Sequence, residues 1–292
     1  MGEENVATGG ILYLVATPIG NLDDISARAL RTLEAVDFIA AEDTRHSRAL
    51  LDRYGISKPL VALHEHNEDR VATVLLERIA GGESAALISD AGTPLINDPG
   101  YPLVRAARAR GLKVSPIPGP CALIAALSAS GLATGRFAFE GFPPRHGSAR
   151  RKLLGELKDD PRTLVFYESS HRILDFCRDI GAVLPAGRPV VIARELTKLH
   201  ETIVATSAAE LAALVCDTPH MEKGEFVVVV AGAEAAAADA VLTAEQERVL
   251  GLLLEECSVK TAAALTARIT GARRETAYRA ALALRQQAEP GG

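Results

Sequence analysis

The chain has 292 residues, of which 48% are hydrophobic and 24% are charged, so it can bury a core large enough for two domains plus an appendage. Its formal net charge of -5 argues against a protein that coats nucleic acid non-specifically, because such binding needs a large basic surface. Widely spaced cysteines without a CxxC pair, an opening without signal-peptide features and the lack of an apolar run of bilayer length predict a cytoplasmic protein with no membrane partner.

Short β-branched runs alternate with helical patterns through the first 130 residues or so. Strands are expected at 11–17, 37–43, 59–65, 85–90 and 113–119. Between them, apolar residues recur at helical spacing in 25–36, and the helical stretch 101–111 ends at a glycine. This alternation predicts a parallel sheet with crossover helices, forming an α/β domain over residues 10–132.

A Gly- and Pro-rich stretch, SGLATGRFAFEGFPP (130–144), is expected to be the crossing into a second domain. Further strands are predicted at 163–169, 189–195, 201–207 and 224–232. Because two pairs of these runs lie close together in the chain, hairpins and a mixed sheet are expected in a second α/β domain over residues 133–233.

Three helical segments are expected near the C-terminus, at 242–257, 259–271 and 273–287. Their short turns predict a small three-helix or helix-turn-helix unit over residues 241–288. Packing or support of a dimer is the alternative to a role in nucleic-acid binding.

The segment SDAGTPLINDPG (89–100) has the strongest pattern of a ligand-binding loop. Asp90 ends a predicted strand, and several Gly, Pro and Asp residues follow it. Ligands bind to open α/β sheets at the carboxyl ends of the strands, although the same residue types also form ordinary turns. The first strand leads into TPIGNLDDIS (17–26), which is not GxGxxG, and this argues against a nicotinamide dehydrogenase or a Rossmann-type methyltransferase.

Eight collinear motifs carry a family resemblance. They are TPIGNLDDIS (17–26), AEDTRHS (41–47), SDAGTPLINDPG (89–100), PIPGPCA (116–122), FEGFPPR (139–145), FYESSHR (166–172), ARELTKLHE (193–201) and GEFVVVV (224–230). Together they closely resemble the ribosomal small-subunit methyltransferase I family within the tetrapyrrole methylase superfamily. The resemblance implies a two-domain tetrapyrrole-methylase-like fold, a homodimer, and S-adenosylmethionine held between the domains.

The resemblance also implies a reaction and a set of cofactor contacts. The methyl group would go to the ribose 2′-hydroxyl of a cytidine in the decoding region of 16S rRNA, on an assembled small subunit. The alternative is a methyltransferase of the same superfamily that acts on a tetrapyrrole or another small molecule. The implied cofactor contacts are Pro18, Asp90, Gly92, Thr93, Leu95, Cys121, Ala122, Tyr167, Ala193, Arg194 and Glu225.

Candidate catalytic residues follow the second predicted strand. A ribose hydroxyl is a poor nucleophile, and a nearby carboxylate can take its proton as the new bond forms. We expect Glu42 or Asp43 to orient or deprotonate the hydroxyl and Arg45 to bind an adjacent phosphate. The alternative is that Asp43 and Arg45 form a structural ion pair at the end of a strand.

Candidate RNA contacts are scattered along the chain. They are His64, His66, Asn67, Arg145, Arg150, Arg151, Lys152, His171 and Lys198. His64 and His66 would share one face of a strand, but with no third ligand and no need for a Lewis acid, no metal is expected. The segment RHGSARRK (145–152) is the best local basic patch, and solvated surface charge is the alternative for His171 and Lys198.

Overall fold

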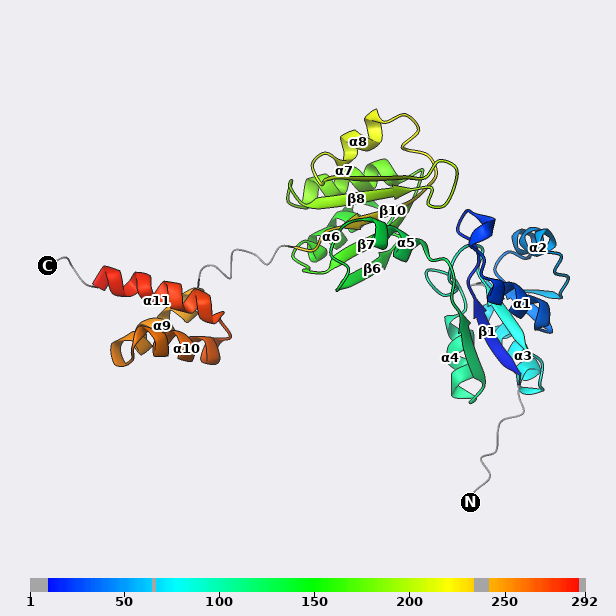
Figure 1. Ribbon diagram of the computed structural model, residues 1–292, viewed down its shortest axis with the longest axis horizontal. Helices are drawn as coiled ribbons and strands as arrows, with labels where there is room; N and C mark the ends of the chain where they lie inside the picture. Colours follow the sequence, from blue (N-terminus) through cyan, green and yellow to red (C-terminus); the bar gives the residue numbers. More distant parts are fainter. Residues whose placement is uncertain (1–9, 65–66, 234–241, 289–292) are drawn as a thin grey trace, which may run out of the picture. The chain divides into compact units, whose positions relative to one another are not determined.

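The computed structural model describes residues 10–64, 67–233 and 242–288, in which strands and helices alternate up to a terminal group of helices (Figure 1). The described residues form two compact units. Residues up to 158 together with 162–231 make the first unit, and residues 159–161 together with those from 232 onward make the second.

Five parallel strands form the first sheet, in the order β3-β2-β4-β1-β5. The strands are β1 (Ile11–Val15), β2 (Phe38–Ala41), β3 (Leu60–Ala62), β4 (Ala85–Ile88) and β5 (Lys113–Ile117). The short helix η1 (Leu22–Asp24) and the helices α1 (Ala27–Ala35), α2 (Thr44–Arg53), α3 (Glu68–Ala80) and α4 (Tyr101–Ala109) connect them.

Helices cover both faces of this sheet, which is why its central strands β2 and β4 are buried along their whole length. Alternate residues of a strand point to opposite faces. Phe38 and Leu87 therefore pack with residues of α3 and α4, whereas Ile39 and Ile88 pack with residues of α1 and α2.

A mixed sheet follows, in the order β6-β7-β10-β8-β9. Strand β6 is parallel to β7, β10 is antiparallel to both β7 and β8, and β8 and β9 form an antiparallel pair. The elements are α5 (Ala122–Ala129), β6 (Phe137–Gly141), α6 (Gly147–Leu157), β7 (Thr163–Ser169), α7 (Ile173–Val183), β8 (Pro189–Arg194), β9 (Thr202–Ser207), α8 (Leu211–Asp217) and β10 (Glu225–Val230).

The two faces of the mixed sheet have different neighbours. One face packs on α6, α7 and α8, with Phe166 and Phe176 fully buried between sheet and helices. The other face presents Val191 and Val227 to α5 and to Ile19 and Ile96, which belong to loops of the first sheet. Loops of the first sheet and the second face of the mixed sheet therefore share one apolar core.

The second compact unit consists of α9 (Ala244–Glu256), α10 (Val259–Thr270) and α11 (Arg274–Ala288) around a small core that includes Leu250, Ala263 and Ala281. Thr243 begins α9 with a capping box shared with Gln246. No helix among the described residues is long and apolar enough to cross a bilayer.

The expected fold class is confirmed: the chain has a parallel sheet, a mixed sheet and terminal helices. Two details differ from expectation. The stretch 130–144 is not only a connection, because it contains β6, a short edge strand whose pattern is obscured by the Gly and Pro residues around it. The second and third strands are also shorter than the predicted runs 37–43 and 59–65: β2 ends at Ala41 and β3 at Ala62. For β2 the reason is that α2 begins at Thr44.

Candidate active site

The loop 89–100 follows the carboxyl end of β4, and its first residues form hydrogen bonds with Thr17, just after β1. Thr17 N donates to Gly92 O at 2.9 Å, and Gly92 N donates to Thr17 O at 3.1 Å. The Thr17 hydroxyl also donates to Ser89 O at 3.2 Å. These buried bonds fix the start of the loop beside the first turn of the chain.

The rest of the loop holds a backbone conformation that few residues adopt. Leu95 and Asn97 have φ values of 70° and 69°, although neither is a glycine. At the end of the loop, Gly100 has a φ of 124°, and its N–H donates to the nearly buried Glu68 carboxylate at 2.7 Å. Strained backbone of this kind persists only where its surroundings hold it, and it is typical of ligand-binding loops.

The same loop also contacts the mixed-sheet part of the unit. The Thr93 hydroxyl donates to Pro120 O at 3.0 Å, just before α5. Gly141, at the end of β6, has a φ of 64°, which favours glycine, and a methyl group there would lie 2.7 Å from Asn97 Oδ1, so β6 ends close to the loop. The loop is therefore held from both sides.

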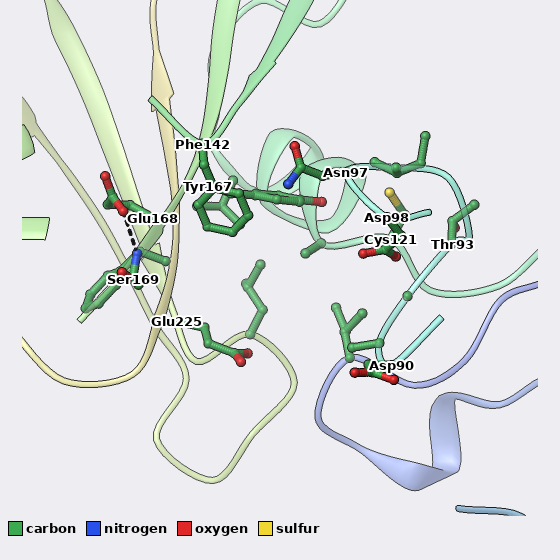
Figure 2. Close-up of a pocket in the computed structure, with 18 residues that line it drawn as sticks. Asp90, Thr93, Asn97, Asp98, Cys121, Phe142, Tyr167, Glu168, Ser169 and Glu225 are labelled. Carbon is green, nitrogen blue, oxygen red and sulfur yellow. Dashed lines mark hydrogen bonds between the residues drawn. The ribbon is translucent and has the colours of Figure 1, made fainter. Parts of the chain in front are cut away.

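A cavity of about 360 Å³ lies beside this loop (Figure 2). Its volume is within the range of small-molecule sites. The lining residues are Ile19, Asp90, Ala91, Gly92, Thr93, Ile96, Asn97, Asp98, Cys121, Ala122, Phe142, Tyr167, Glu168, Ser169, Leu196, Glu225, Phe226 and Val227. The loop supplies one wall and β7, β10 and the start of α5 supply the others.

The carboxylates of this lining belong to Asp90, Asp98, Glu168 and Glu225, and no Lys or Arg is among the lining residues. Glu168 is paired with Arg172 at 3.1 Å and Glu225 with Lys198 at 2.9 Å, which leaves Asp90 and Asp98 without a basic partner among the ion pairs of the described residues. Burial, helped by the negative charges of Glu42 and Asp90 and partly offset by a hydrogen bond with Ser89, raises the pKa of Asp98 to about 6. The cavity is thus suited to a cationic ligand and contains a carboxylate that changes protonation near neutral pH.

Tyr167 forms the inner wall of the cavity. Its hydroxyl accepts a hydrogen bond from Leu123 N, at the start of α5, at 3.0 Å. Burial raises the pKa of Tyr167 well above its ordinary value, with Cys121 as the next cause, so the phenol stays protonated. Its ring lies edge-on to Phe139 at 4.8 Å and to Phe142 at 5.8 Å, which builds an aromatic wall from β6 and β7.

Glu225 stands at the opposite side of the cavity and is held by Lys198. The Lys198 ammonium lies 2.9 Å from Glu225 and 2.9 Å from Glu195. A methyl group at Gly20 would come 2.4 Å from Lys198 Cγ, so the first turn of the chain packs against the same lysine. Lys198 therefore connects three segments around the cavity and lies beside the site with its charge engaged by protein carboxylates.

Most of the expected cofactor residues line the cavity: Asp90, Gly92, Thr93, Cys121, Ala122, Tyr167 and Glu225. The remaining four, Pro18, Leu95, Ala193 and Arg194, are not part of the lining. Pro18 and Ala193 are buried beside it, and Leu95 packs on the core of the first sheet. Arg194 donates to Lys223 O at 2.5 Å and to His200 O at 3.3 Å, so its side chain fixes loop backbone.

The candidate catalytic residues Glu42, Asp43 and Arg45 all lie outside the cavity lining. Asp43 is the N-cap of α2, and its carboxylate accepts hydrogen bonds from Arg45 N at 2.8 Å and His46 N at 3.2 Å. These bonds lower the pKa of Asp43, which makes it a weaker base. Glu42 acts on Asp98 electrostatically, and Arg45 is exposed in a separate open hollow with Arg48. None of the three lines the cavity.

Of the RNA contacts expected after β3, Asn67 has a structural role instead. Asn67 precedes α3, accepts from His64 N at 2.9 Å and donates to Ala62 O at 3.1 Å, so its amide closes the turn. His64 is half-buried, and His66 lies outside the described residues. Within the described part of the chain, no group of three His, Cys, Asp or Glu side chains is arranged to hold a metal ion.

The basic segment 145–152 contains both exposed and buried charges. Arg150 is nearly buried and lies 2.6 Å from the buried Asp179, so it is not available to a phosphate at the surface. Arg151 shares Asp179 at 2.9 Å but is 52% exposed, and Lys152 is 79% exposed. The expectation of an RNA contact is therefore compatible with Arg145, Arg151 and Lys152, and the buried position of Arg150 argues against it there.

Asp98 and Phe142 are two of the lining residues that were not singled out from the sequence. Asp98 was visible only as one of several turn residues in loop 89–100, and Phe142 only as part of FEGFPPR. A charged residue in a glycine-rich loop is a weak signal by itself. Their direction into the cavity depends on the packing of two distant segments, so composition and spacing could not reveal it.

Comparisons with known proteins agree with this geometry. The chain matches the tetrapyrrole (corrin/porphyrin) methylases over residues 11–212 and the RsmI C-terminal HTH domain over residues 240–285. It is 52% identical to ribosomal RNA small subunit methyltransferase I of Xylella fastidiosa strain Temecula1, over 94% of this chain and 99% of that protein. The chain belongs to this family of tetrapyrrole methylases.

Further relatives have the same name. The protein from Pseudomonas aeruginosa is 52% identical over 94% of this chain and 98% of its own length, and that from Escherichia coli O157:H7 is 53% identical over 94% and 95%. Among solved structures, diphthine synthase covers 76% of this chain and 90% of its own, with a TM-score of 0.55 and 17% identity. A Thermus thermophilus uroporphyrin-III C-methyltransferase complexed with S-adenosylhomocysteine covers 75% and 97%, with a TM-score of 0.52 and 19% identity. These structures establish the shared fold.

Proposed function

We propose that this chain transfers the methyl group of S-adenosylmethionine to the ribose 2′-hydroxyl of a cytidine in the decoding region of 16S ribosomal RNA. The observation that carries the proposal is a preformed cavity with an acidic lining, in a chain that is half identical to proteins named ribosomal RNA small subunit methyltransferase I. The same geometry also suits the methyl donor chemically.

The methyl donor is S-adenosylmethionine, and the cavity residues fit it. Its sulfonium and its ammonium group are cationic, and Asp90 and Glu225 supply negative charge on opposite sides of the cavity. Gly92 has a φ of 83°, and a methyl group there would lie 3.2 Å from the Ile19 side chain, so glycine keeps the backbone open to a ligand. The apolar surface from Ile96, Leu196 and Val227 suits the adenosine part.

When bound, S-adenosylmethionine supplies a methyl group on a positively charged sulfur, which is already a strong electrophile. The remaining task for the protein is to hold the 2′-oxygen in line with that methyl group and to accept its proton. The loop 89–100 and the wall formed by Tyr167 are the parts that hold position, because buried or half-buried hydrogen bonds fix both.

Asp98 takes the place that we expected for Asp43 as the acceptor of the hydroxyl proton. Asp98 lines the cavity, whereas Asp43 caps a helix outside it. With a pKa of about 6, the Asp98 carboxylate is ionised at neutral pH and is a better base than an ordinary aspartate. Glu42 assists by its negative charge, which helps to hold the pKa of Asp98 high.

The proposal includes partners that lie outside the chain. The substrate is the assembled small ribosomal subunit in the cytoplasm, and the active form is a homodimer of subunits whose two sheets form domains over residues 10–132 and 133–233. The helices of residues 241–288 add arginines at Arg268, Arg273 and Arg274. A dimer would double the basic surface that a chain with net charge -5 can offer to RNA.

The test is transfer of tritium from labelled S-adenosylmethionine to small subunits that lack the modification, to naked 16S rRNA and to a porphyrinogen. We expect label in small subunits, at a ribose, and a mass increase of one methyl group in a single cytidine. Label in the porphyrinogen alone would overturn the proposal. A Gly92→Ala variant, which alters the cavity wall and strains the backbone at a φ of 83°, is the negative control, with its thermal unfolding measured in parallel.

A further inference from the structure

A second hollow, of about 660 Å³, adjoins the cofactor cavity. It is lined by Phe142, Pro143, Pro144, Arg145, Ser169, His171 and Arg172. Phe142 and Ser169 line both hollows, so the two are adjacent at this point. We call this second hollow the basic groove, because Arg145, His171 and Arg172 are its ionisable residues and no acidic residue lines it.

Phe142 is an aromatic side chain left in solvent at the boundary between the two hollows. It is 48% exposed, although a phenylalanine usually buries most of its surface. Its ring lies edge-on to Tyr167 (Figure 2), and Tyr167 is itself edge-on to Phe139. One side of the Phe142 ring is thus supported by the aromatic wall and part of its surface is open.

The backbone around Phe142 is unusually rigid for a loop. Two prolines follow it, and a residue before proline is restricted to extended conformations. The Arg172 guanidinium donates to the carbonyl of Pro143, and Arg172 is in turn held by the buried Glu168 at 3.1 Å. Phe142 is therefore held in place before any ligand binds, which reduces the entropy lost on binding.

The two hollows have opposite charge. The cofactor cavity is acidic, whereas Arg145 and His171 are exposed on the basic groove. A nucleotide in RNA has a flat base on one side of its ribose and phosphates on the other. A base on Phe142 and a phosphate beside Arg145 would place the ribose between them, at the mouth of the cofactor cavity.

We propose that Phe142 is the stacking platform for the base of the target nucleotide, turned out of its helical stack, and that Arg145 and His171 receive the adjoining phosphates. This inference rests on the proposed function and adds to it the residues that select and place an extruded RNA nucleotide. Enzymes that modify single nucleotides commonly turn them out of the stack and read them with aromatic side chains.

The test compares four variants at Phe142 and one control, with saturating S-adenosylmethionine and varied concentrations of unmodified small subunits. Stacking on an aromatic ring predicts that Phe142→Ala and Phe142→Leu lower kcat/KM for subunits by about 5- to 150-fold, and that Phe142→Tyr and Phe142→Trp stay within about threefold of wild type. Phe137→Ala is the matched control, because Phe137 is 39% exposed on β6 and lines neither hollow.

Calorimetric titration with S-adenosylmethionine separates stacking from a role in the cofactor cavity. We expect the cofactor affinity of Phe142→Leu, which keeps an apolar side chain at the edge of the cavity, to stay within about twofold of wild type. Full activity of Phe142→Leu would refute stacking, and a loss of cofactor affinity that accounts for the whole defect would make Phe142 a cavity wall only. If wild type itself labels no subunits, the proposed function fails rather than this inference.

Salt dependence tests the phosphate contacts. Arg145→Gln should reduce the slope of log affinity for subunits against log salt by about one, because one phosphate contact is lost. Arg178→Gln is the control, since Arg178 is 60% exposed on α7 and outside the basic groove. Equal slopes for Arg145→Gln and wild type would show that the basic groove does not hold the RNA backbone.

Discussion

Replacing Asp98 by asparagine separates its role in proton transfer from its role in the shape of the cavity. Asparagine has nearly the same size and can still bond to Ser89, but it accepts no proton. The removal of a general base typically lowers a rate by about 10²- to 10⁴-fold. We therefore expect Asp98→Asn to bind S-adenosylmethionine normally and to transfer methyl at least about 100-fold more slowly.

The dependence of the wild-type rate on pH is a second quantity that the pKa of Asp98 predicts. With a pKa of about 6, nearly all Asp98 is ionised at pH 7.5 and roughly a quarter at pH 5.5, so the rate should fall about fourfold between these values. Asp98→Asn should lack this decline. Glu42→Gln should move the decline to lower pH, because the charge of Glu42 contributes to the raised pKa.

The same pKa has a consequence for stability with a defined sign. The folded state binds the proton of Asp98 more tightly than the unfolded chain, whose aspartate has a pKa near 3.8. Folding stability due to Asp98 therefore increases as pH falls from about 6 to about 4, and ionised Asp98 is destabilising at pH 7.5. A shift of this size corresponds to about 3 kcal/mol, reduced to roughly 1–2 kcal/mol because Asp98 is only half-buried.

The assay measures methyl transfer at saturating subunits and cofactor from pH 5.5 to 8.5, with thermal unfolding on the same samples. Asp98→Asn should unfold at a higher temperature at pH 7.5 while losing activity. Asp175→Asn, at an exposed position on α7, should change neither. A rate for Asp98→Asn within threefold of wild type, or a profile that keeps its acid decline, would refute the role of Asp98 as base.

Three further predictions concern the supporting structure. Gly92→Ala should weaken cofactor binding in calorimetry and destabilise the protein by about 1–2 kcal/mol, because φ is 83° there; normal binding would contradict the cavity assignment. Arg150→Met should destabilise folding by up to about 3–5 kcal/mol in urea, because the nearly buried Asp179 then keeps only the half-exposed Arg151 as its partner. Arg151→Gln should change the free energy of unfolding by under about 1 kcal/mol, and equal effects of the two variants would contradict the burial argument. Tyr167→Phe should lower the free energy of unfolding by about 1 kcal/mol in the same measurement, because Leu123 N at the start of α5 loses the hydroxyl to which it donates.

Local pattern was enough to predict the architecture. The two buried strands β2 and β4 and the hairpin of β8 and β9 each have a continuous apolar or alternating run, and the terminal helices have clear helical spacing and caps. Such signals come from residues within a few positions of each other. The pattern failed at β6, where a five-residue edge strand lies between glycines and prolines.

The candidate site was predictable only as a set of loops. The loop 89–100 could be recognised from its glycines, prolines and aspartates, and most of the residues expected to hold the cofactor do line one cavity. Which acidic residue faces that cavity could not be read in this way. Asp43 looked like the base and caps a helix, whereas Asp98 looked like a turn residue and lines the site.

The exposure and the partners of charged side chains were the least predictable from the sequence. In the sequence, Arg145 and Arg150 belong to one basic patch and Lys198 is a further surface lysine. In the fold, Arg150 is buried against Asp179 and Lys198 is held between two glutamates, while Arg145 remains exposed on the groove. The reason is physical: a helix or strand follows from neighbouring residues, but the solvation and partner of a charge depend on segments that meet only when the chain has folded.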